Sequence, residues 1–133
     1  MQPFSLSIVT PTGAVVSTEI DEVTLPGSEG EFGVLPAHQP ALVMLGGGAV
    51  SYRGPSGTGT VFVQGGVVEI RPDSVLVLTD RALMPGDIDR TAAQQQLKQL
   101  NEVADNGMIL DDDAIRRKRA ERGYAEAVAT HTG

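Results

Sequence analysis

The sequence predicts an all-β domain followed by a short helical segment, and three observations lead to this fold class. All 8 prolines and most of the 16 glycines lie within residues 1–86. Apolar residues in that part come in short, β-branched runs, whereas residues 88–128 are rich in Ala, Gln, Arg and Asp. We therefore expect a β domain over residues 1–86 and a helical segment over residues 87–133.

Short apolar runs predict the strands of the first part, since each is bounded by turn residues. The runs are 6–9, 14–16, 20–25, 61–63, 67–70 and 75–78. We expect turns at 11–13, 26–27, 46–48, 54–57, 65–66 and 72–73, spaced as closely as a sandwich or flattened barrel requires. Alternate residues of 67–71 and of 75–78 lie on opposite faces, so at least one of these strands has a solvated side.

The second part predicts two helices joined as an antiparallel hairpin. Asp87 or Asp89 can cap the first helix, and the left-handed conformation that glycine tolerates ends it at 106–107. The aspartates at 111–113 open the second helix where its dipole favours negative charge; on a helix they point in different directions, which argues against a Mg²⁺ site.

The apolar face of each predicted helix is narrow. The first offers Ala93, Leu97, Leu100 and Ala104, and the second offers Ile115, Tyr124 and Val128 with Gly123 among them. Most helical stability in proteins comes from packing such a face. We therefore expect the hairpin to depend on docking, either against its own β domain or against a partner.

Composition excludes several classes of function. The chain has 133 residues and no cysteine, which removes thiol nucleophiles, thiolate metal sites and redox motifs. A formal charge of -7 argues against nucleic-acid binding. The longest apolar stretches are far shorter than the roughly 20 residues of a membrane-spanning helix, and we expect no leader sequence.

No nucleophile, base and orienting group lie together in the sequence, so a binding or mechanical part is favoured over an enzyme. His38 has no cysteine or second ordered histidine near it, which argues against a metal site. The glycines at 27, 30 and 33 are interpreted as a permissive loop, because the lysine of a phosphate-binding loop is absent there. One basic cluster stands out in the second helix: Arg116, Arg117, Lys118, Arg119 and Arg122.

That basic cluster has three readings. The first interpretation is a solvated helix surface. The other two are docking to an acidic protein surface and binding of a nucleotide phosphate, since the planar fork of arginine suits both carboxylate and phosphate. A free-standing β-sandwich module for ligand binding is a further alternative for the whole chain. Its five aromatic residues, Phe4, Phe32, Tyr52, Phe62 and Tyr124, offer such a module few stacking surfaces.

Three local motifs resemble the epsilon subunit of the F-type ATP synthase. They are IVTPTG at 8–13, LPGSEGEFGVLPAHQP at 25–40 and FVQGGVVEI at 62–70. The resemblance runs from residue 4 to about residue 93. It implies an N-terminal ten-stranded β sandwich with a C-terminal two-helix arm, and the role of a non-catalytic rotor subunit bound to the gamma subunit.

The resemblance also implies particular contacts. Glu31, with Glu29 and His38 as neighbours, corresponds to the edge that faces the membrane ring of c subunits. The basic cluster matches the residues that meet an acidic region of the alpha and beta subunits when the arm is extended, and that block ATP hydrolysis. The implied location is peripheral, on the cytoplasmic face of a bacterial inner membrane.

Some members of this family bind ATP in the folded arm through an Ile/Leu-Asp-x-x-Arg-Ala motif. Here the matching residues begin Ile88, Asp89 and Arg90, but Ala92 stands where the motif has arginine. Since that arginine is the group best suited to hold phosphate, we expect no resident cofactor.

Overall fold

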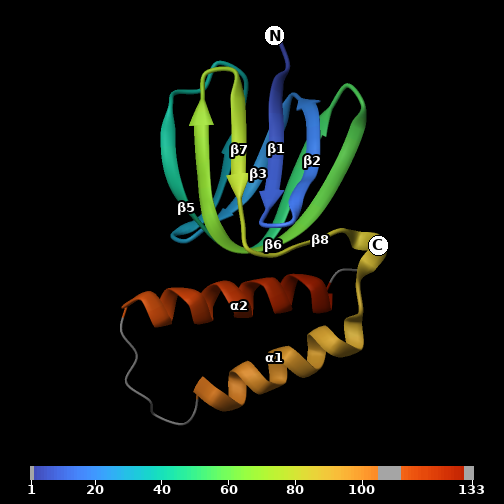
Figure 1. Ribbon diagram of the computed structural model, residues 1–133, viewed down its shortest axis with the longest axis vertical. Coiled ribbons are helices and arrows are strands. Elements are labelled where there is room, and N and C mark those ends of the chain that lie inside the picture. The colour runs from blue at the N-terminus through green and yellow to red at the C-terminus, as the bar shows by residue number, and fades with distance from the viewer. Residues whose placement is uncertain (1, 105–111, 131–133) are drawn as a thin grey trace.

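The computed structural model describes residues 2–104 and 112–130, which form a β domain and two helices (Figure 1). The strands are β1 (Phe4–Thr10), β2 (Gly13–Ile20), β3 (Glu22–Gly27), β4 (Gly30–Val34), β5 (Ala41–Gly54), β6 (Gly57–Arg71), β7 (Ser74–Leu78) and β8 (Ala82–Leu83). A 3₁₀ turn at Pro85–Asp87 leads to α1 (Arg90–Ala104), and α2 (Asp112–Thr130) follows. The β domain with C-terminal helices agrees with the predicted fold class.

The β domain is a sandwich whose two layers share their longest strands (Figure 1). The second half of β6 pairs with the first half of β5 and with β7, and β7 continues to β1 and β2. The first half of β6 pairs with the second half of β5 and with β8, and β5 continues to β3 and β4. The described residues therefore form eight strands, and the predicted number of ten is wrong because β5 and β6 each serve both layers.

Glycines allow β5 and β6 to bend and so to belong to both layers. Residues 46–48 and 65–66 were expected to be turns between strands, but they lie inside β5 and β6, where the chain bends and continues. Gly65 and Gly66 have φ of 72° and 125°, a region that glycine adopts without penalty. A Cβ on Gly66 would lie 1.9 Å from the carbonyl oxygen of Leu78. The expected run 20–25 also divides, with a bend at Asp21 between β2 and β3.

The main core lies between the two layers. Alternate residues face inward as predicted, so Val68 and Ile70 of β6 and Val75 and Val77 of β7 are buried. The remaining members include Leu6, Ile8, Leu25, Leu45 and Val50. Every residue of this core precedes residue 78, so the sandwich has a complete core without the helices.

The helices lie at one end of the sandwich. α2 runs across the bends of β5 and β6, and α1 lies antiparallel to α2 on its far side (Figure 1). Asp89 caps α1, because its Oδ1 accepts a hydrogen bond of 3.0 Å from the amide of Ala92. The expected end of the first helix at 106–107 and Asp111 lie outside the described residues. Within the described ranges, neither helix has the length and apolar character needed to span a membrane.

Candidate functional site

α2 meets the sandwich through two glycines in backbone contact. A Cβ on Gly47 of β5 would lie 1.8 Å from the carbonyl oxygen of Ala120, and a Cβ on Gly123 would lie 2.3 Å from the carbonyl oxygen of Gly47. Only glycine at both positions permits this approach. Gly123, which lies among the apolar residues of the predicted second helix, is therefore part of its docking contact.

A second, smaller core forms where the helices meet the sandwich. Phe62, Ala93, Tyr124 and Val128 are buried in it. The guanidinium carbon of Arg81 lies 4.7 Å from the centre of the Tyr124 ring, as in a cation–π contact. Burial raises the pKa of Tyr124 above its ordinary value of 10.0, and the charge of Arg81 opposes part of that rise. Docking thus favours the neutral phenol.

The predicted helix faces are partly revised by this packing. Tyr124 and Val128 are buried as expected, but Ile115 is 36% exposed and lies outside both cores. Ala93 is buried and Leu97 is half-buried on α1. The side chains of Leu100 and Ala104 lie outside the described residues.

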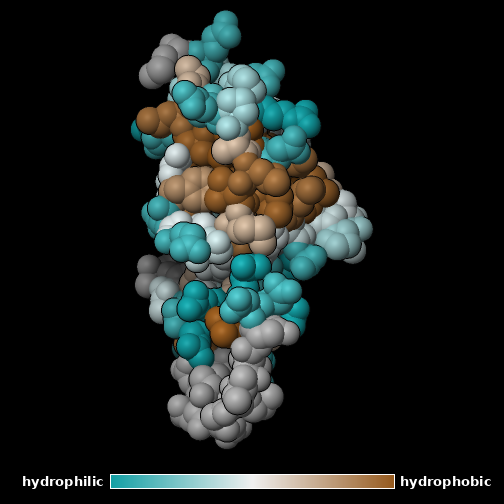
Figure 2. Space-filling view, turned by 90° about the vertical axis from the view of Figure 1, so that its left-hand side faces the viewer, coloured by the Kyte–Doolittle hydropathy of each residue, from teal (hydrophilic) through white to brown (hydrophobic). Residues whose placement is uncertain are grey.

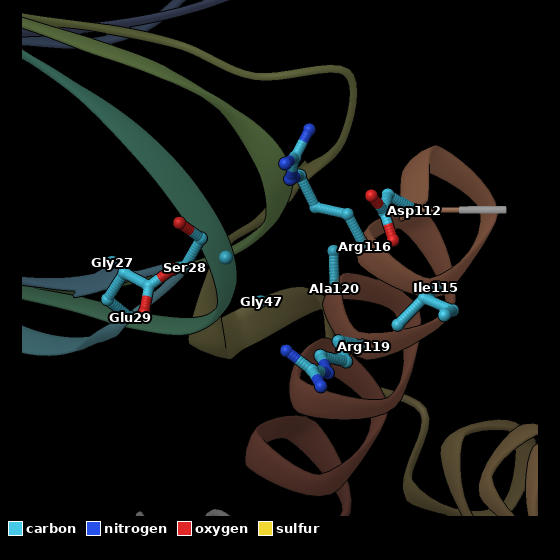
Figure 3. A pocket seen from close by; sticks show the side chains of 10 residues that line it. Gly27, Ser28, Glu29, Gly47, Asp112, Ile115, Arg116, Arg119 and Ala120 are labelled. Carbon is cyan, nitrogen blue, oxygen red and sulfur yellow. The ribbon is translucent and has the colours of Figure 1, made fainter.

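The basic cluster lies mainly on the first half of α2. Arg116, Arg117 and Arg119 are exposed, whereas Lys118 and Arg122 are half-buried. Arg116 forms an ion pair at 3.3 Å with Asp113, which lies three residues before it. Asp112 lies four residues before Arg116. The side chains of Arg116 and Arg119 extend from α2 toward the β3–β4 turn (Figure 3).

A polar cavity of about 330 Å³ separates these arginines from the sandwich. Its sandwich wall contains Ser28 and Glu29 of the β3–β4 turn, and its helix wall contains Asp112, Arg116 and Arg119 (Figure 3). With the arm docked, part of the basic cluster therefore lies beside Glu29. Two groups that the sequence assigned to different partners share one cavity.

The three residues assigned to the ring contact lie at two different places. Glu29 and Glu31 are both exposed at the β3–β4 hairpin, and Glu29 lines the cavity beside α2. His38 follows β4, and its Nδ1 lies 2.7 Å from the carbonyl oxygen of Leu35 while its Nε2 contacts the carbonyl of Arg71. The Phe4 ring packs edge-on against it at 4.9 Å. His38 therefore holds the loop after β4 to the end of β6, at the end of the sandwich remote from the helices.

An exposed apolar face covers the outer side of one layer. Leu42 and Met44 of β5 are 71% and 44% exposed, and Leu78 of β7 is 44% exposed. Met44 pairs with Val67, and Val67 pairs with Leu78, so these side chains form a row across three strands. We call this surface the apolar face, with Val9, Leu42, Met44, Val67, Leu76 and Leu78 as its members.

The apolar face has one charged residue within it. Glu69 pairs in register with Leu42 and Leu76, and its carboxylate lies 2.7 Å from the guanidinium of Arg71. Hydrophobic side chains gather over the sandwich when the molecule is viewed from the β5 side (Figure 2). Sequence reasoning missed this surface, although apolar residues at both odd and even positions of 75–78 and 41–45 were a signal for it.

The sequence matches a known family over the whole sandwich. The model of the beta-sandwich domain of the ATP synthase delta/epsilon chain matches residues 3–85. The chain belongs to this ATP synthase family.

Individual relatives extend the match into the helices. The ATP synthase epsilon chain of Granulibacter bethesdensis is 36% identical over 132 residues, covering 96% of this chain and 98% of the relative. That of Nitratidesulfovibrio vulgaris is 42% identical over 108 residues, covering 76% and 81% of the two chains. These relatives support the predicted epsilon-type rotor subunit, which is not itself catalytic.

Solved structures show the same fold at low identity. A chain of the Euglena gracilis mitochondrial ATP synthase, in an assembly of OSCP, F1 and c-ring, matches with a TM-score of 0.75 and 18% identity, covering 96% of this chain and 79% of that one. A chain of the Tetrahymena thermophila mitochondrial ATP synthase central stalk and c-ring has a TM-score of 0.63 and 16% identity, covering 96% and 97%. The sandwich with its helical arm is thus the fold of ATP synthase chains.

The residues that the sequence matched to a nucleotide-binding motif support the arm itself. Ile88 is half-buried against the second core, and the Asp89 carboxylate is engaged in capping α1. The Arg90 side chain lies outside the described residues. Ala92 donates its amide to Asp89 and brings no charged group to the motif.

Proposed function

We propose that the chain is the epsilon subunit in the central stalk of an F-type ATP synthase and couples proton flow through the membrane ring to ATP synthesis in the catalytic head. The apolar face is the observation that carries this proposal, together with membership of the family. In this role the chain is peripheral to the membrane, on the cytoplasmic face of a bacterial inner membrane.

The gamma subunit is the partner proposed for the apolar face. Soluble domains rarely leave a contiguous row such as Met44, Val67 and Leu78 open to water unless a partner covers it. The sheet beneath it is held by a complete core, so the face is presented on a rigid support. A partner docked there would bury apolar surface worth roughly 25 cal/mol per Å².

The c-subunit ring is the partner proposed for the β3–β4 hairpin. Glu31 and Glu29 present two exposed carboxylates at this hairpin, which suits basic side chains on loops of the ring. His38 lies elsewhere and is occupied by backbone carbonyls, so its proposed part is to fix the loop after β4. Charge complementarity at such a contact sets orientation more than affinity.

The arm is proposed to regulate ATP hydrolysis. Docked as described here, α2 keeps the basic cluster against the sandwich and away from the catalytic head. Among the described residues, the second core that holds the arm has four buried members, so we expect the docked and extended arrangements to differ by only a few kcal/mol. Extension would carry the basic cluster toward acidic surfaces of the alpha and beta subunits.

Affinity purification of the tagged full-length chain from detergent-solubilised membranes tests the proposal. We expect gamma, with alpha and beta, to accompany the chain, and Met44→Asp to abolish their recovery because a carboxylate is placed in the apolar face. Ser51→Asp is the matched control, since it adds the same charge at an exposed position of β5 in the other layer. Equal recovery with Met44→Asp and wild type would show that the apolar face is not the gamma contact.

A further inference from the structure

His38 contacts two backbone carbonyls at once, one through each nitrogen of its ring. Its Nδ1 lies 2.7 Å from the carbonyl oxygen of Leu35, and its Nε2 contacts the carbonyl oxygen of Arg71. A carbonyl oxygen only accepts hydrogen bonds, so both ring nitrogens must donate for both contacts to be favourable. A neutral imidazole has one N–H and one lone pair, whereas the imidazolium donates from both nitrogens. The geometry therefore fits the protonated ring.

The His38 ring has little freedom to avoid this requirement. It is half-buried, and the buried Phe4 ring packs against it with centroids 4.9 Å apart and planes at 69°. A neutral ring held in this position would turn a lone pair toward one of the two carbonyl oxygens, and that contact would open. Because Leu35 belongs to the same loop as His38, opening of the Arg71 contact would release the loop from β6.

The backbone of this loop needs such an anchor. Ala37 has φ of 63°, in the left-handed region that disfavours a residue with a Cβ. The contact from His38 to Arg71 lies directly beyond the Ala41–Ile70 pair at which the β5–β6 ladder begins. The His38 side chain thus adds one further link between the two segments and holds the loop in its strained conformation.

The segments that touch the His38 ring carry few charges. Neither β1 nor residues 35–40 contain another charged side chain. At the end of β6, Glu69 and Arg71 form an ion pair at 2.7 Å, and Asp73 follows in the β6–β7 turn. Since histidine is the side chain that ordinarily changes charge between about pH 5 and pH 8, the ring itself is the group through which these contacts respond to pH in that range.

We propose that His38 is a proton-dependent clamp. With both nitrogens protonated, the ring holds the loop of residues 35–40 to the end of β6, and loss of one proton to solvent breaks one contact and loosens the loop. Closure is therefore fully stabilised at low pH, and this stabilisation is lost as the pH rises through the titration of the ring. The loop continues into β5, where Leu42 belongs to the apolar face, so protonation orders the chain beside that surface whichever partner covers it.

NMR spectroscopy of the full-length chain tests the clamp at about pH 6 and about pH 8. We expect N–H signals from both ring nitrogens of His38 at the lower pH and from one at the higher pH. The backbone order parameters of Ala37 and Gln39 should fall from about 0.85 to below about 0.6 as the pH is raised. The amide of Glu29, at the other end of the sandwich, is the internal reference and should not change.

His38→Gln and His131→Gln are the matched variants, since the chain has only 2 histidines. His38→Gln removes the titrating ring, so the order of its loop should be the same at both pH values, whereas His131→Gln should keep the wild-type response. A pH response that persists in His38→Gln would overturn the clamp, because another group would then be titrating.

The wild-type chain decides the matter even if His38→Gln does not fold. A single ring N–H signal from His38 at about pH 6 would contradict the clamp, because one carbonyl would then have no donor. The same loop order at about pH 6 and about pH 8 would contradict it as well, since the protonation state would have no effect on the backbone.

Discussion

Tyr124 reports the state of the arm at the level of a single side chain. Its ring is buried between α2 and the sandwich, and Arg81 lies over the ring. Burial raises its pKa because the phenolate is disfavoured in a site with little water. A group whose pKa is higher in the docked form stabilises docking fully below its ordinary pKa, and this stabilisation is lost as the pH rises through the shifted value.

The tyrosinate absorbance of the Tyr52→Phe variant tests this, since the chain has only 2 tyrosines and Tyr124 then stands alone. We expect its titration midpoint to lie above 10.0, and undocking of the arm to accompany it. Tyr124→Phe should remove the dependence of docking on pH in this range. A midpoint at or below the ordinary value would mean that the ring is solvated and the arm is not docked in solution.

At the level of the element, docking of α2 depends on the absence of side chains. Gly47 and Gly123 let the helix backbone approach β5, which brings Tyr124 and Val128 into the second core. Glycine weakens an isolated helix by about 1 kcal/mol relative to alanine. Gly123 therefore lowers the intrinsic helical stability of α2 but allows the close approach that docking requires.

Gly123→Ala separates these two effects. The added Cβ would meet the Gly47 carbonyl at 2.3 Å, so we expect docking to weaken by about 1–3 kcal/mol even as α2 gains intrinsic helical stability. In a Tyr52→Phe background, quenching of the remaining tyrosine fluorescence measures the exposure of Tyr124, and circular dichroism measures helix content. Gly33→Ala is the control, since its Cβ would meet only the Val23 carbonyl, at 3.8 Å. Unchanged quenching in Gly123→Ala would show that α2 is not held by this contact.

Local patterns in the sequence predicted part of this arrangement. The alternation in 67–71 and 75–78 identified the buried faces of β6 and β7, because the two-residue period of a strand is a local property. The cap at Asp89 followed from the chemistry of free helix amides in the same way. The family motifs also anticipated the sandwich and its arm.

Contacts between distant segments could not be predicted. The glycines at 46–48 and 65–66 permit either a turn or a bend, and only the pairing of β5 with β6 over their full lengths decides for the bend. Gly123 contacts Gly47, which lies 76 positions earlier in the chain, so no periodicity within α2 could indicate the role of Gly123. The assigned neighbours Glu29 and His38 were close in sequence, but β4 carries the chain from one end of the sandwich to the other between them.

On the scale of the whole molecule, the sandwich and the arm have separate cores, and we expect the arm to be the less stable of the two. The main core is complete by residue 77, whereas the second core draws Phe62 from the sandwich and its other members from the helices. The arm can therefore leave while the sandwich stays folded. Amides of α1 and α2 should accordingly exchange before those of the strands.

A chain ending after Gly86 tests the regulatory part of the proposal. We expect this sandwich to fold and to assemble with gamma, and we expect ATP hydrolysis by the assembled head to rise at least about fivefold when the basic cluster is missing. Recovery of the truncated chain with gamma is the control for assembly. Hydrolysis at the wild-type rate in a fully assembled complex would rule out inhibition by the arm.

The continuous strands β5 and β6 have a mechanical consequence. In a sandwich whose layers are joined only by loops, the two sheets can slide over each other when a sideways force acts on one of them. Here two strands pass through covalently from one sheet into the other, and their hydrogen bonds to each other follow them around the bend. A torque applied to the apolar face should therefore reach the β3–β4 hairpin with little sliding between the two sheets, as a subunit that transmits rotation requires.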